Sequence, residues 1–160
     1  MAGVEKISDL LEVAIRIERA GVEFYKTLSD NAQSSGAKDT FSFLAAEEEK
    51  HIGTFRSILE KVADYAPRLN YPGEYELFLQ GIAGRSIGTL QKAKDENILA
   101  GRNISAAVDV ALDMETESIL FYSGMLENFR ESERRYINEV IAEEKAHFVK
   151  LLTTRDKIKF

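Results

Sequence analysis

The chain contains no cysteine among its 160 residues, and only two histidines and two prolines. The lack of cysteine excludes disulfides, thiolate zinc sites, iron–sulfur clusters and cysteine nucleophiles within the chain. No apolar run approaches the roughly 18 residues that a membrane-spanning helix needs. The N-terminus also lacks the basic and then apolar segments of a signal peptide, so we expect a cytoplasmic protein.

Acidic residues outnumber basic ones, with 27 Asp and Glu against 21 Lys and Arg and a formal net charge of −6. This balance argues against nucleic acid or an acidic membrane surface as a partner. A hydrophobic content of 44% and a charged content of 30% are ordinary for a globular protein. The length fits a single domain spanning residues 1–160.

The two prolines, Pro67 and Pro72, lie in one short segment, residues 66–73, which is the clearest break in the chain. On both sides of this break, apolar residues recur every three or four positions, as they do in amphipathic helices. We predict an N-cap at Ser8 and a turn at residues 34–36. The predicted helices span residues 8–32, 38–64, 105–129 and 132–155.

Residues 74–104 link the two helix pairs and are too long for a hairpin, so we expect them to cross the bundle. Within them we predict two short helices, one starting in 74–79 and one spanning 86–97. Three glycines in this stretch are interpreted as turns or close helix contacts: Gly81, Gly84 and Gly88. The pattern predicts an all-α four-helix bundle with a long crossover between helices two and three.

A glutamate interrupts the apolar stripe near the middle of each long helix. The four glutamates are Glu18, Glu48, Glu115 and Glu144. The only histidines, His51 and His147, each lie three residues after one of them, and residues three apart share a face of a helix. Each half of the chain therefore supplies a glutamate followed by a Glu-x-x-His pair, which is a ligand set for two metal ions.

Neighbouring acids offer an alternative to this ligand set. A lone Glu-x-x-His pair is usually a solvated helix pair, but two pairs on four apolar stripes point to metal. Glu47 and Glu143 lie four residues before the histidines and could be ligands instead. The register of the stripes selects Glu48 and Glu144, and it places Glu47, Glu49 and Glu143 toward solvent.

Burial of four carboxylates in a helical core needs compensation, because each loses its hydration at a cost of several kcal/mol. No arginine or lysine lies on the stripes to neutralise them. Two divalent ions would supply four positive charges, and a ferric pair would need a bridging oxide in addition. Carboxylate and imidazole ligands suit iron or manganese.

Tyr25 and Tyr122 each follow a stripe glutamate by seven residues, which is two helical turns. As core tyrosines they need partners for their hydroxyl groups. The functional alternative is a hydrogen bond to a metal-bound carboxylate or a role as a local electron donor. The two halves of the chain also resemble each other around these residues, which suits two metals related by a pseudo-twofold axis.

With these motifs, the chain resembles the ferritin-like di-iron carboxylate proteins, and most closely their rubrerythrin branch. The resemblance covers residues 5–65 and 105–155 and is carried by the stretches 14–18 and 115–122 and by both Glu-x-x-His pairs. It implies two iron ions with a bridging oxo or hydroxo ligand. By the resemblance, Glu48 and Glu144 bridge the ions, Glu18 and Glu115 bind terminally, and each histidine binds one ion.

The chain departs from rubrerythrins at two points. Ser118 stands where they carry an extra glutamate, and the chain has no cysteine for a rubredoxin domain. The remaining ligand set is similar to that of bacterioferritin, although Glu49 and Lys50 stand where bacterioferritin has its haem-binding methionine.

The resemblance implies an oxidoreductase that reduces hydrogen peroxide or dioxygen with electrons from an external carrier, and a homodimer. The alternatives are a ferroxidase that handles iron and a metal-binding module without catalytic activity.

Overall fold

The computed structural model describes residues 7–62 and 72–158, and these residues form helices with no strand among them. The five α-helices and two 3-10 turns are α1 (Ile7–Asn31), α2 (Ser35–Val62), α3 (Pro72–Asp95), η1 (Ile98–Ala100), α4 (Ile104–Met125), η2 (Leu126–Asn128) and α5 (Glu131–Ile158). The predicted all-α bundle is confirmed. None of the described helices is long and apolar enough to cross a membrane.

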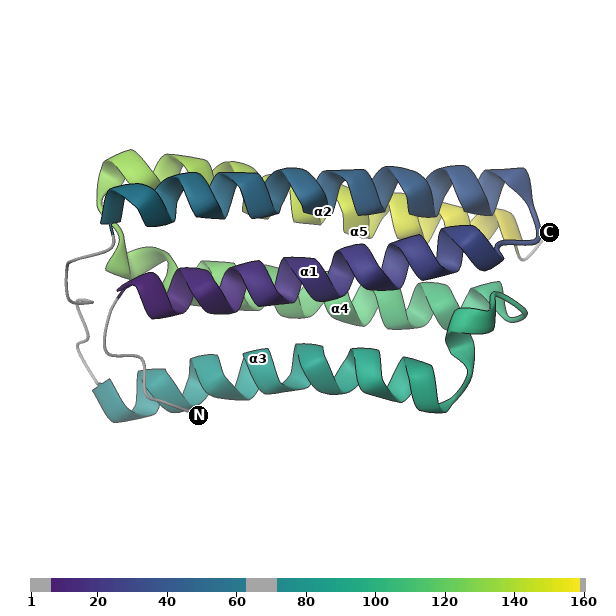
Figure 1. Cartoon of the computed structure of the whole chain (residues 1–160), viewed down its shortest axis with the longest axis horizontal. Helices are drawn as coiled ribbons and strands as arrows, with labels where there is room; N and C mark the ends of the chain where they lie inside the picture. The colour runs from purple at the N-terminus through teal and green to yellow at the C-terminus, as the bar shows by residue number, and fades with distance from the viewer. Residues whose placement is uncertain (1–6, 63–71, 159–160) are drawn as a thin grey trace.

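The four-helix bundle consists of α1, α2, α4 and α5 (Figure 1). Helix α3 lies along α1 and α4, on the side away from α2 and α5, and runs the length of the bundle. It is the predicted crossover, and because of it α4 begins at the same end of the bundle as α2.

Two helix starts differ from the prediction. Helix α1 already includes Ile7, so Ser8 lies inside the helix and is not its N-cap. Helix α2 begins at Ser35, because the Ser34 hydroxyl accepts a hydrogen bond from the Ala37 N–H at 3.2 Å and caps the helix there. The predicted turn at 34–36 is therefore shorter than expected.

The crossover is one continuous helix and not two short ones. Pro72 is its first residue, where the missing N–H of proline costs no hydrogen bond. Most of the predicted break at residues 66–73 falls in residues 63–71, which lie outside the described residues. Gly81, Gly84 and Gly88 lie inside α3 with open space around them, so they form neither turns nor close contacts. The helix is held by a buried face with a spacing of three and four residues: Leu79, Ala83, Ser86, Leu90 and Ala93.

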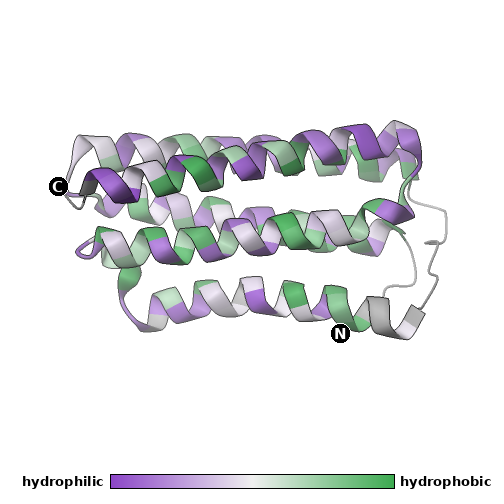
Figure 2. Ribbon diagram, turned by 180° about the vertical axis from the view of Figure 1, so that it is seen from behind, coloured by the Kyte–Doolittle hydropathy of each residue, from purple (hydrophilic) through white to green (hydrophobic). Residues whose placement is uncertain are grey.

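The core consists of two apolar clusters, one toward each end of the bundle. One contains Leu11, Phe55 and Phe121, the other contains Phe24 and Phe41, and each has further members from α3, α4 and α5. Hydrophobic and hydrophilic residues mix along every helix (Figure 2). The stripe glutamates lie between the two clusters in sequence on each helix, so apolar packing fixes the helices on both sides of them.

Gly101 is expected to be required for the α3–α4 connection. Its φ is 69°, and a Cβ there would lie 2.5 Å from the Asn31 carbonyl oxygen. Gly101→Ala should lower the free energy of unfolding by more than about 1–2 kcal/mol, since left-handed strain and the clash add. Gly84→Ala is the control, because no heavy atom lies within 4 Å of a Cβ there, and it should raise stability by up to about 1 kcal/mol. Equal urea midpoints for the two variants would contradict this account.

Candidate metal centre

The structure brings the six predicted ligands together in the middle of the bundle. Helix α1 supplies Glu18, α2 supplies Glu48 and His51, α4 supplies Glu115, and α5 supplies Glu144 and His147. All six side chains are buried, and the most exposed of them, Glu48, is only 4% exposed. The helical register that selected Glu48 over Glu47 and Glu144 over Glu143 therefore agrees with the burial.

The six residues form two overlapping groups, each with its ligand atoms within 4.8 Å of one another. The first group is Glu18, Glu48, His51 and Glu144, and the second is Glu48, Glu115, Glu144 and His147. Glu48 and Glu144 belong to both groups. This is the arrangement that two adjacent cation sites with two shared carboxylates require.

Both histidines direct Nδ1 at the carboxylates. His51 Nδ1 lies 3.2 Å from Glu144 Oε1 and 3.4 Å from Glu18 Oε2. His147 Nδ1 lies 3.1 Å from Glu144 Oε2 and 3.7 Å from Glu115 Oε2. The two imidazole rings are 5.5 Å apart between centroids and inclined by 22°, so they are stacked.

Three buried atoms in this cluster form no hydrogen bond of good geometry, although Glu18 Oε2 and Glu144 Oε1 lie 3.4 Å and 3.2 Å from the third, His51 Nδ1. Buried polar atoms are nearly always satisfied, so three unsatisfied ones at one point indicate a missing partner. All three belong to the first group, and all are atoms that bind metals. The residues present therefore fit a carboxylate and histidine metal site.

Without metal, the cluster retains protons. Burial raises the pKa of Glu18, Glu48 and Glu144, and the charges of the neighbouring carboxylates raise each further. Burial alone would lower the pKa of His147, but hydrogen bonds to Glu115 and Glu144 outweigh it and raise that pKa to about 10. Metal ions entering the site must displace these protons.

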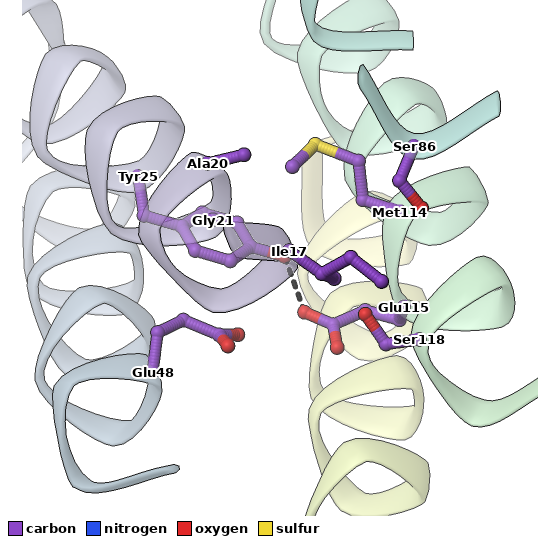
Figure 3. A pocket seen from close by; sticks show the side chains of 9 residues that line it. All are labelled: Ile17, Ala20, Gly21, Tyr25, Glu48, Ser86, Met114, Glu115 and Ser118. Carbon is purple, nitrogen blue, oxygen red and sulfur yellow. Dashed lines mark hydrogen bonds between the residues drawn. The ribbon is translucent and has the colours of Figure 1, made fainter. Parts of the chain in front are cut away.

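The two tyrosines bind carboxylates of the facing helix. The Tyr25 hydroxyl donates to Glu115, as Figure 3 shows, and the Tyr122 hydroxyl donates to Glu18. Burial raises the pKa of both phenols, and the nearby Glu115 and Glu18 carboxylates raise it further, so both remain donors. Each tyrosine thus fixes an unshared carboxylate: Tyr122 fixes Glu18 of the first group, and Tyr25 fixes Glu115 of the second.

Glu143 contacts His51, and the sequence did not predict this contact. Glu143 was expected to face solvent, and its side chain is 53% exposed, yet its Oε2 lies 2.9 Å from His51 Nε2 across the α2–α5 interface. A carboxylate that accepts from Nε2 leaves the Nδ1 lone pair of His51 free for a metal. The equivalent residue in the first half, Glu47, instead pairs with Lys50 and is partly covered.

Comparison with known proteins agrees with this geometry. The family model for rubrerythrin matches residues 9–153. The chain belongs to the rubrerythrin family. The chain is also similar to a protein from Thermotoga maritima, whose crystal structure is described as that of a candidate ferritin-like diiron-carboxylate protein. It is 27% identical, covers 98% of each chain and superposes with a TM-score of 0.68. No curated protein matches the chain.

The family match confirms the resemblance inferred from the sequence. It extends through the crossover helix α3, which the sequence resemblance covered only loosely.

Proposed function

We propose that this rubrerythrin-family protein is a di-iron oxidoreductase that reduces hydrogen peroxide or dioxygen with electrons from an external carrier. The observation that carries the proposal is the pair of overlapping buried groups that share Glu48 and Glu144. The family assignment and the diiron-carboxylate description of the Thermotoga maritima relative support iron as the metal.

In this proposal Glu48 and Glu144 would supply ligands to both ions, because they belong to both groups. Glu18 and His51 would hold one ion, and Glu115 and His147 would hold the other. Iron is the expected metal, with manganese as the alternative for the same ligands and an oxo or hydroxo group as the further bridge. Two ferrous ions bound here would supply the two electrons that, with two protons, reduce hydrogen peroxide to two water molecules.

The chain's own contribution is to hold this ligand set rigidly. Tyr25 and Tyr122 fix Glu115 and Glu18, and Glu143 orients His51. The apolar clusters toward both ends of the bundle limit the access of bulk water to the ligands. The external carrier and the homodimer remain predictions, as does the cytoplasmic location.

Oxidation of the anaerobically prepared di-ferrous protein tests the function. We expect rapid formation of di-ferric absorbance with either oxidant, retention of the iron, and re-reduction by an added electron carrier. Dioxygen should compete with peroxide, because Ser118 cannot provide the additional carboxylate ligand of rubrerythrins. Oxidation as slow as that of free ferrous ion would contradict the proposal and favour a metal-binding module. Fast oxidation followed by release of ferric iron would contradict it in favour of iron handling.

Tyr25→Phe is expected to weaken the site without emptying it. The substitution leaves the buried Glu115 carboxylate without its donor, and an unsatisfied buried acceptor costs about 1–3 kcal/mol. Iron affinity measured with a competing chelator should fall about tenfold or more, by the same amount as in Tyr122→Phe, since the two contacts are equivalent. Tyr136→Phe is the control, because the Tyr136 side chain is surface-exposed. Unchanged affinity in both core variants would show that the hydroxyls serve packing alone.

A further inference from the structure

A small cavity lies beside the metal centre, between α1, α4 and the crossover helix α3 (Figure 3). Its lining includes the Glu48 and Glu115 side chains, and α3 contributes Ser86. It offers about 10 Å³ to the centre of a water-sized molecule. That is close to the room that one buried water needs, so the cavity can hold one small molecule next to the ligands.

Ser86 is the unusual residue of this cavity. It is 3% exposed, and its hydroxyl has no hydrogen-bond partner. On α3 it stands in the middle of the buried apolar face, between Ala83 and Leu90. In Figure 3 its oxygen points to the side of the cavity where Ser118 and Glu115 lie. Leaving such a hydroxyl unsatisfied is unfavourable, so a molecule that forms a hydrogen bond with it is stabilised there.

The other walls keep the space open. Gly21 and Ser118 both line the cavity. Gly21 lies three residues after Glu18, and Ser118 lies three residues after Glu115. A Cβ at Gly21 would lie 3.3 Å from Glu48 Cδ, so a larger residue there would press on the carboxylate. Met114 forms a further wall, and its unbranched side chain can shift to admit a molecule slightly larger than water.

We propose that this cavity is a binding subsite for one small molecule with O–H groups, held by the Ser86 hydroxyl beside Glu115. Water occupies it at rest, and hydrogen peroxide occupies it during the reaction; this second part rests on the proposed function. Both molecules donate and accept hydrogen bonds, whereas dioxygen does not donate any. Ser86 therefore strengthens the binding of peroxide, whereas the rate of reaction with dioxygen does not depend on Ser86.

The first test needs no metal. A high-resolution crystal structure of the metal-free protein should show one ordered water within hydrogen-bond distance of Ser86 Oγ. In Ser86→Val the added methyl group occupies this space, and the water should be gone while the helices stay in place. A dry cavity in the unaltered protein would overturn the proposal.

The second test measures the iron-loaded protein. Ser86→Ala removes the hydroxyl with little change in volume, and we expect the KM for hydrogen peroxide to rise about tenfold, the effect of one lost hydrogen bond. Iron content, kcat and the rate of oxidation by dioxygen should stay as they are. Ser29→Ala is the matched control, because Ser29 is also a buried helical serine but its hydroxyl already has a partner in Ser42.

The outcomes separate the subsite from the proposed function. If the unaltered protein reduces peroxide and Ser86→Ala has the same KM, the subsite is wrong and the function stands. If the unaltered protein reacts with dioxygen but not with peroxide, the function stands and the peroxide part of the subsite is wrong. If it reacts with neither oxidant, the function fails, and the crystallographic water alone decides whether the subsite exists. Parallel loss of the peroxide and dioxygen reactions in Ser86→Ala would indicate a structural role for Ser86 and overturn the proposal.

Discussion

Glu48→Ala is expected to remove both metal ions from the protein. Glu48 contributes a ligand atom to each of the two groups, so its loss leaves neither with its full set of donors. Glu144→Ala should have the same effect, since Glu144 is the other shared carboxylate. The measurement is the metal content per chain after anaerobic reconstitution and removal of excess iron, which should fall from two ions to nearly none.

Two further variants make this result specific. Glu47→Ala changes the preceding residue, whose partly covered carboxylate pairs with the exposed Lys50, and it should retain both ions. His51→Ala should lose chiefly one ion, because His51 belongs to a single group. If Glu48→Ala retained two ions while Glu47→Ala lost them, the helical register assigned to the site would be wrong.

The metal-free protein is expected to lose stability as the pH rises from about 6.5 to about 10. In the folded state the pKa of His147 is raised to about 10, from 6.5 in the unfolded chain. The folded state therefore binds the proton more tightly, so the stabilisation is complete below pH 6.5 and is lost as the pH passes the folded pKa. The buried Glu18 and Glu48 act in the same direction, because burial raises their pKa and the unfolded chain releases their protons first. The total loss should be on the order of several kcal/mol.

Urea denaturation at a series of pH values, with a chelator present, measures this loss. The metal-loaded protein should behave differently, because metal ions compete with the same protons and bind more tightly as the pH rises. The stabilisation by metal should therefore be greatest at alkaline pH. A metal-free protein whose stability stays constant or rises between pH 6.5 and 9 would show that the cluster does not hold protons as described.

The bundle could be predicted from the sequence because four apolar stripes with three-four spacing leave few ways to bury them. The crossover helix α3 could not be predicted at its full length, because three glycines and a proline suggested interruptions. The low helix propensity of the glycines is outweighed there by tertiary contacts, because the buried face from Leu79 to Ala93 packs along α1 and α4. The start of α2 was missed for a smaller reason: the capping hydroxyl belongs to Ser34, one residue before Ser35, and both are serines.

The grouping of the six candidate ligands followed from helical geometry, because a glutamate and a histidine three residues apart must share a face. The contact between Glu143 and His51 depends on the rotation and packing of α2 against α5, which spacing within one helix does not determine. Ser86 was missed for the same reason, since its place beside Glu115 depends on how α3 lies across α1 and α4. The part of the site that depends on spacing within one helix could be predicted. The contacts between helices could not.

Metal analysis of the protein purified without oxygen tests the central claim most directly. The account predicts two iron ions per chain, or two manganese ions in their place, lost together in Glu48→Ala and retained in Glu47→Ala. A protein that contains no metal, and takes up none when ferrous ion is supplied anaerobically, would contradict it.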